Sequence, residues 1–140
     1  MKDILVPLSP GELLDKITIL RIKVARIQDA TKLANVKLEL SLLEQIWKDA
    51  GGTQHDVALD ERALENLNER LWDIEDRIRE QEARQIFDRD FIELARAVYL
   101  RNDERAAIKK RINVRLGSRI VEEKSYSESG PNRAAHRGRR

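Results

Sequence analysis

Polar and charged side chains interrupt the apolar pattern of the last long helical segment. The alternation by three and four residues that runs through Phe91, Leu94 and Val98 reaches Arg101 and Arg105 before it returns to an apolar residue. Burying an unpaired charge between helices is strongly unfavourable, so these side chains must be paired, hydrated or bound to a ligand.

Two interpretations of this polarity stay open. A cationic pocket between helices would bind a phosphate- or carboxylate-bearing ligand, because guanidinium groups recognise such anions through paired hydrogen bonds; its residues would be Lys16, Lys23, Arg101, Asn102 and Arg105. Alternatively, Arg105 pairs with Asp15 or Glu75 in a network that fixes helix register, whose further members would be Thr18 and Arg79. The structural interpretation is favoured, since charges beside an apolar seam usually pair with one another.

Residues for other kinds of catalysis are few. The chain has no cysteine and only two histidines, His55 and His136, and neither lies in a Glu-x-x-His pair of the kind that holds a metal in a helical bundle. The carboxylate pairs Glu12 with Asp15 and Asp73 with Asp76 are common on solvated helix faces. No phosphate-binding loop or nucleophile elbow is present. We predict no metal and no cofactor, and favour a protein that is not an enzyme.

The charge is unevenly distributed along the chain. The net charge is +2, and the last eight residues carry four arginines and no acid, so residues 1–132 have a net charge of 2 − 4 = −2. A basic tail can contact nucleic acid, but more often it only aids solubility, and nucleic acid is not an expected partner. The start resembles no signal peptide and no stretch is apolar enough for a membrane span, which predicts the cytoplasm.

The composition is typical of long helices, with 41% hydrophobic and 37% charged residues but only 6 Gly and 3 Pro. Ser9-Pro10-Gly11-Glu12 forms a capping box, which predicts a helix start at Ser9. Coiled-coil-like apolar seams follow, and the polar residues 28–31 divide the first from the second. Residues 9–50 are therefore two helices joined by a tight turn or one continuous helix, and both stay open.

Later stop and start signals predict two further helices. Gly51-Gly52 ends the second seam, Asp60 can cap a third helix, and Asp88 can cap a fourth that ends at Gly117. The sequence thus predicts an all-α antiparallel bundle of about four long helices in up-down-up-down order. That order would bring residues 4–6 and 120–121 to one end, where they could form a short extended pairing. The bundle domain is expected over residues 1–126 and a disordered basic tail over 127–140.

Several motifs in a fixed order resemble an uncharacterised bacterial family of helical proteins. They are VPLSPGELLDKITILRIK, KLANVKLELSLL, FDRDFIELARAVYLRNDERAAIKKRIN and GSRIVEEKSY. The family is marked by V-P-x-S-P-G-E-L-x-D-K-x-T-I-L near its start and E-E-K-S-Y near its end. The resemblance implies no activity that can be transferred. It places the chain after about Tyr126 outside the shared unit.

The amphipathic seams, together with the lack of a catalytic constellation, favour a helical protein-interaction module. A long, thin bundle leaves apolar surface that a second copy can cover, so a homodimer is expected, with an unidentified protein partner. The alternative is a small-molecule binder or enzyme that uses the cationic pocket. Whether the charged side chains converge on an open cavity or are closed off by carboxylates decides between the two.

Overall fold

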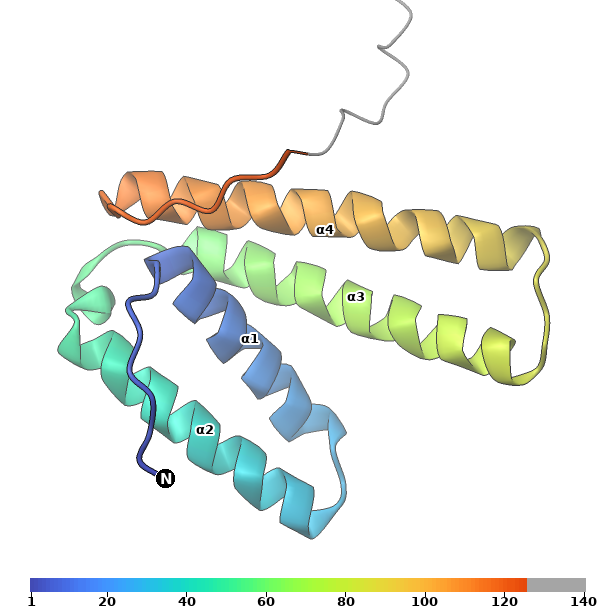
Figure 1. Ribbon diagram of the computed structural model, residues 1–140, viewed down its shortest axis with the longest axis horizontal. Coiled ribbons are helices and arrows are strands. Elements are labelled where there is room, and N and C mark those ends of the chain that lie inside the picture. Colours follow the sequence, from blue (N-terminus) through green and yellow to red (C-terminus); the bar gives the residue numbers. More distant parts are fainter. Residues whose placement is uncertain (126–140) are drawn as a thin grey trace, which may run out of the picture.

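The protein folds into four α-helices and one 3-10 turn within residues 1–125, the part of the chain that the computed structural model describes (Figure 1). The helices are α1 (Pro10–Arg26), α2 (Ala30–Asp49), η1 (Gly52–Gln54), α3 (Ala58–Ala83) and α4 (Arg89–Arg115). No β-strand occurs in the described range. The predicted all-α bundle is confirmed, whereas the predicted tail over 127–140 lies outside the described residues.

Side-chain caps fix three of the helix starts. The Ser9 hydroxyl accepts a hydrogen bond from the Glu12 amide at 3.3 Å, and the Asp88 carboxylate accepts one from the Phe91 amide at 3.1 Å. The carboxylate of Asp29 accepts a hydrogen bond from the amide of Lys32 at 2.8 Å. This cap starts a new helix after the extended residue Ile27, so residues 9–50 form two helices.

The prediction that Asp60 caps the third helix is wrong. Helix α3 already begins at Ala58, which places Asp60 within its first turn. There its carboxylate accepts a hydrogen bond from Arg111 of α4 at 2.7 Å and lies 3.5 Å from Arg115. The acid is therefore used to join α3 to α4, and its place near the positive end of the helix dipole adds to its stability.

The four helices form two hairpins that lie across one another. In Figure 1 the chain reverses direction between α1 and α2, and again between α3 and α4. Helix α1 contacts α3 and α4, whereas α2 packs mainly against α1 and η1. The guanidinium group of Arg21 on α1 lies 2.7 Å from Glu61 on α3 and 3.5 Å from Glu44 on α2, so it joins three helices. The up-down order expected of a regular bundle stays a prediction.

The apolar core lies where the hairpins cross. Leu14, Val57, Leu64 and Ile112 form a buried cluster, and Trp47 packs against its edge. The turn after α2 wraps closely around that indole: a Cβ at Gly52 would lie 2.1 Å from a ring atom of Trp47. Gly51 adopts a φ of 82°, which glycine accommodates without steric cost. The Gly-Gly stop therefore ends α2 and also seats Trp47.

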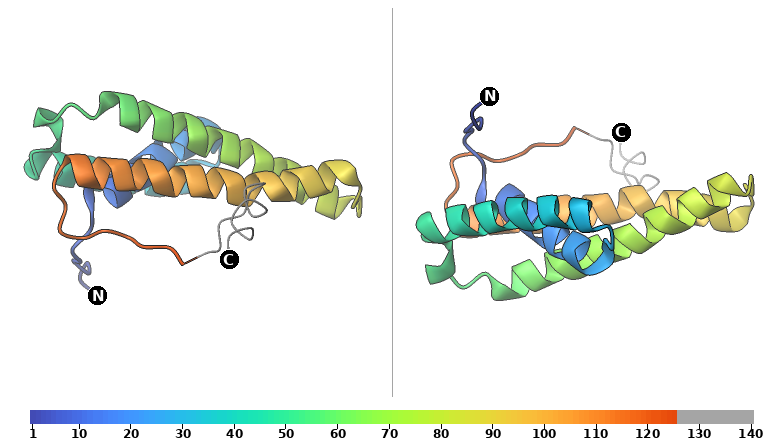
Figure 2. Two further views of the ribbon diagram at one scale, coloured as in Figure 1. Left: turned by 90° about the horizontal axis from the view of Figure 1, so that it is seen from above. Right: turned by 90° about the horizontal axis from the view of Figure 1, so that it is seen from below.

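The suggested extended pairing of the two ends does not form. The segment before α1 and the segment after α4 leave the bundle on the same side (Figure 2), but neither residues 4–6 nor residues 120–121 belong to a strand or bridge. That second segment instead runs back alongside α4, where Glu122 lies 3.1 Å from Lys109 and Glu123 lies 3.5 Å from Lys110. These ion pairs hold it away from the start of the chain, so the pairing is wrong. None of the helices in residues 1–125 has the length and apolar composition of a membrane span.

Candidate functional site

A buried polar network joins α1 to α3. Asp15, Thr18 and Asn68 are respectively 4%, 0% and 4% exposed. The side-chain amide of Asn68 donates hydrogen bonds to the Asp15 carboxylate at 2.9 Å and to the Thr18 hydroxyl at 3.1 Å. Thr18 in turn donates to the backbone carbonyl of Asp15 at 2.9 Å. Because the amide nitrogen is directed at Asp15 and Thr18, the amide oxygen of Asn68 points the other way, and the network fixes the orientation of the Asn68 amide.

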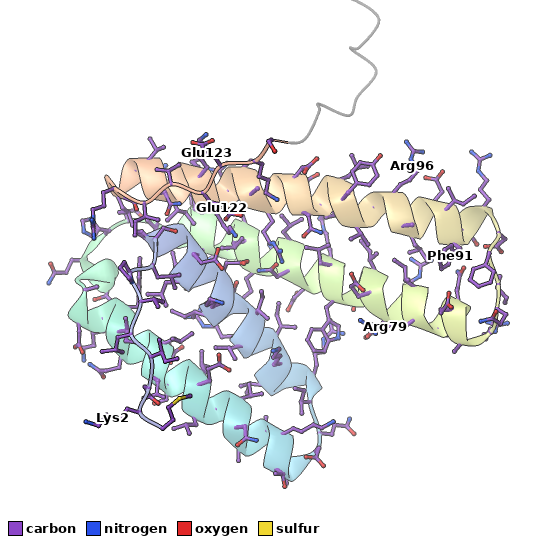
Figure 3. All side chains as sticks on the ribbon, in the orientation of Figure 1. Lys2, Arg79, Phe91, Arg96, Glu122 and Glu123 are labelled. Atoms are coloured by element: carbon purple, nitrogen blue, oxygen red, sulfur yellow. The ribbon has the colours of Figure 1, made fainter. Side chains whose placement is uncertain are left out.

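Beside this network, Lys109 of α4 is surrounded by three carboxylates. Its ammonium nitrogen lies 2.7 Å from Glu12, 3.1 Å from Glu122 and 3.9 Å from Asp15. Glu122 belongs to the segment that follows α4 (Figure 3). The lysine side chain is only 11% exposed. One cation thus joins α1, α4 and the segment after α4. Because carboxylates of the protein surround its ammonium group, this cluster leaves no charge of Lys109 open to a ligand.

The pKa values of Lys109 and Glu12 are shifted in opposite directions. Burial acts to lower the pKa of Lys109, but its hydrogen bonds to Glu12 and Glu122 and the charge of Asp15 raise it above the ordinary value. Burial acts to raise the pKa of Glu12, but the hydrogen bond and charge of Lys109 outweigh it and lower the pKa. Both shifts favour the charged forms, so the pair is ionised around neutral pH.

A close backbone approach brings these groups together. The amide of Gly11 donates a hydrogen bond to the side-chain oxygen of Asn113 at 2.7 Å. A Cβ at Gly11 would lie 2.5 Å from the backbone oxygen of Lys109. Only glycine lets the first turn of α1 come this near to α4, and that distance is what places Glu12 against Lys109.

One turn before Lys109, α3 and α4 border an open cleft of about 440 Å³. Its lining is partly apolar, with Leu71 and Trp72. Its polar side chains are Asn68, Glu75, Asp76 and Arg79 from α3, and Asn102 and Arg105 from α4. Arg79 projects from the part of α3 that extends beyond α1 (Figure 3). The cleft therefore brings charges of both signs next to an aromatic ring.

The charges in the cleft do not neutralise one another. Arg105 donates one long hydrogen bond, of 3.4 Å, to the side-chain oxygen of Asn68. Within residues 1–125 no ion pair forms at Arg79 or Arg105, nor at Glu75 or Asp76. This arrangement can accept a polar molecule, because its donors and acceptors are still available.

The structure separates the five residues of the predicted cationic pocket. Asn102 and Arg105 line the cleft, whereas Lys16 is exposed and lies 3.9 Å from Glu12. Arg101 pairs with Glu104 on the surface of α4, and Lys23 is a half-buried residue of α1 that does not border the cleft.

The residues of the predicted structural network are divided as well. Asp15 and Thr18 hydrogen-bond in the buried network through Asn68. Glu75 and Arg79 instead line the cleft. Arg105 forms no ion pair with Asp15 or Glu75 in the described structure.

Three important residues were in neither predicted set. Lys109 lies one turn after Arg105 on the polar stripe of α4, and Asn68 lies about two turns before Glu75 on that of α3, so helical spacing could have added both. Glu122 gave no such signal, because it lies after the last helix and reaches Lys109 only through the return of the chain. Among residues 1–125, no group of three or more His, Asp or Glu side chains is placed to hold a metal ion.

Comparisons with known proteins give one match. No curated protein and no solved structure is similar to this chain. A family of unknown function, DUF6165, matches residues 4–135, which include part of the segment that the resemblance placed outside the shared unit. Because this match covers nearly the whole sequence, the chain belongs to the DUF6165 family.

Proposed function

We propose that the chain is a non-catalytic helical interaction module of the cytoplasm, and that it forms a homodimer through α2 and the segment before α1. One observation carries the proposal: α2 has a second apolar face that nothing in the described structure covers. Leu38, Leu42 and Ile46 are 62%, 50% and 49% exposed.

These three residues form a continuous stripe. They are spaced four apart on one helix, so their side chains lie on the same face. The other large apolar residues of α2, which include Val36 and Trp47, are buried or half-buried. A surface helix with one partner needs only one apolar face, so a second face supports a second partner.

The segment before α1 extends this surface. Ile4, Leu5 and Val6 are 75%, 88% and 65% exposed, and the segment projects from the bundle in both views of Figure 2. With Ile46 and Trp47 they line an apolar cavity of about 520 Å³. Because Ile46 belongs to both features, the cavity and the stripe form one continuous apolar surface.

A second copy of the chain fits this surface by symmetry. Two α2 helices that cross in opposite directions around Leu42 would place Leu38 of each copy near Ile46 of the other. A stable interface buries about 800 Å² on each partner, which an exposed 20-residue helix face together with an apolar arm can supply.

Sedimentation velocity of the full chain tests the dimer. We expect the wild type to sediment as a dimer at about 50 µM and Leu42→Glu to sediment as a monomer with an unchanged helical circular dichroism spectrum, because the charge would be buried at the centre of the interface. Leu59→Glu is the matched control: Leu59 is 77% exposed on α3, outside this surface, and the variant should stay dimeric. A monomeric wild type, or equal behaviour of the two variants, would refute the proposal.

A further inference from the structure

The cleft between α3 and α4 has a mixed charge that restricts what can bind there. Its two arginines, Arg79 and Arg105, are matched by two acids, Glu75 and Asp76, so the four formal charges sum to zero. Glu75 and Arg105 are half-buried, while Asp76 and Arg79 are exposed. A simple anion would be repelled by the acids, and a simple cation by the arginines.

The arginine side of the cleft is held in place from within the bundle. The Asn68 amide is fixed by Asp15 and Thr18, and its remaining oxygen is directed at Arg105. Asn68 is 4% exposed, so this orientation does not depend on solvent. Arg105 is thereby positioned without having its charge neutralised, and its other donors stay available. Such preorganisation lowers the entropic cost of binding a ligand.

Helix α3, which carries Arg79, also supplies the complementary chemistry. Glu75 and Asp76 can accept hydrogen bonds from an ammonium group, and Trp72 offers an aromatic surface to the same cation. Asn102 on α4 adds one more group that can donate or accept. The volume of about 440 Å³ lies within the range of small-molecule sites.

We infer that this cleft binds a small zwitterionic molecule, whose phosphate or carboxylate lies against Arg79 and Arg105 and whose ammonium group lies against Glu75 and Asp76. The ligand satisfies both pairs of charges at once, and the described structure shows no ion pair within or between them. Leu71 and Trp72 contact the short carbon chain that connects its two charged groups. The cleft contains no residue of α2 or of the segment before α1, so this site is independent of the proposed dimer surface.

Calorimetric titration of the full chain with three zwitterions of different spacing tests the inference. The probes are phosphoethanolamine, γ-aminobutyrate and β-alanine, with inorganic phosphate and ethanolamine as the singly functional controls. We expect the best zwitterion to bind about tenfold more tightly than phosphate or ethanolamine, because it alone pairs with both the arginines and the acids. If no zwitterion binds, or if phosphate binds as well as the best zwitterion, the inference is wrong.

Variants of an arginine and of an acid in the cleft give a sharper test. Arg105→Gln should abolish binding of the best zwitterion, whereas Arg101→Gln should leave it unchanged, because Arg101 lies one turn away and pairs with Glu104. Glu75→Gln should remove the preference for the zwitterion over phosphate, since the anion then meets one repulsive charge fewer. Equal effects of the two arginine variants, or an unaltered preference in Glu75→Gln, would overturn the assignment.

Quenching of Trp72 fluorescence provides an independent measurement of site occupancy. In a Trp47→Phe background Trp72 is the remaining tryptophan, and the zwitterion should change its emission with the same affinity as in calorimetry. Titratable heat without any change in Trp72 emission would place binding elsewhere on the chain and refute the site.

Discussion

Two consecutive turns of α4 carry cations with opposite surroundings. Lys109 has three carboxylates within 4 Å, whereas Arg105, four residues earlier, has no carboxylate of the described residues within that distance and donates a hydrogen bond of 3.4 Å to the amide oxygen of Asn68. Both residues belong to the same polar stripe. What differs is the neighbouring helix: α1 touches α4 near Lys109 and runs away from it farther along (Figure 1).

This divergence explains why carboxylates surround Lys109, whereas Arg105 one turn earlier borders an open cleft. Gly11 allows the first turn of α1 to approach the backbone of α4, which delivers Glu12 and Asp15 to Lys109. Beyond that contact, α1 no longer covers α4, and the space between α3 and α4 is lined by side chains without ion pairs in the described structure. The crossing of the two hairpins thus places Lys109 among carboxylates that stabilise the fold and leaves Arg105 beside the cleft without an ion pair to any described residue.

Replacing Lys109 should have the largest effect on stability. Lys109→Met leaves Glu12 and Asp15 without the ammonium group at the helix junction, and we expect a loss of about 3 kcal/mol in the free energy of unfolding. Urea denaturation followed by circular dichroism measures it. Lys110→Met is the control, because Lys110 is exposed and pairs only with exposed Glu123, and it should change the stability by less than about 0.5 kcal/mol. Equal losses in both variants would contradict the closed cluster.

The pH dependence of stability should report the same cluster with a smaller effect. The pKa of Glu12 in the folded protein is lowered from its ordinary value of 4.5, so its contribution is fully present above pH 4.5 and is lost as the pH falls below it. Glu12→Gln should therefore be less stable than the wild type at pH 7 by about 1 kcal/mol, after allowance for partial solvent screening, and this difference should shrink in acid.

Urea titrations at several pH values between 3 and 7 give this difference directly. Glu123→Gln serves as the comparison, since its carboxylate is 73% exposed and lies 3.5 Å from Lys110. A wild-type-minus-variant difference that stays constant with pH for Glu12→Gln would show that the carboxylate charge is not what stabilises the junction.

Local sequence signals predicted the helices well. Ser9 and Asp88 are N-caps because their side chains reach an amide three residues ahead, a geometry that spacing alone determines. The polar residues 28–31 indicated a break between two helices, but the competing continuous helix could be excluded only from the structure. Asp60 was misread because its partner Arg111 lies on another helix, and a distant partner leaves no local signal.

The candidate site was only half predictable for the same reason. Helical periodicity placed Asn102 and Arg105 on a polar stripe, and both line the cleft. It could not show that Lys16 and Arg101 lie elsewhere, because the rotation of each helix about its axis is set by packing with the others. The sequence pointed to either a cationic pocket or a closed network of ion pairs. The described structure contains both, a closed network at Lys109 and an open cleft at Arg105.

Replacing Arg105 should have the smallest effect on stability. Arg105→Gln removes a charge that has no ion pair in the described structure, and the glutamine amide can still reach toward Asn68, so the free energy of unfolding should change by less than about 0.5 kcal/mol. The same denaturation measurement compares it with Lys109→Met. A loss as large as that of Lys109→Met would mean that Arg105 stabilises the bundle, and the cleft would then be structural. A near-neutral result together with lost zwitterion binding separates the two turns of α4 into one that maintains the fold and one that binds.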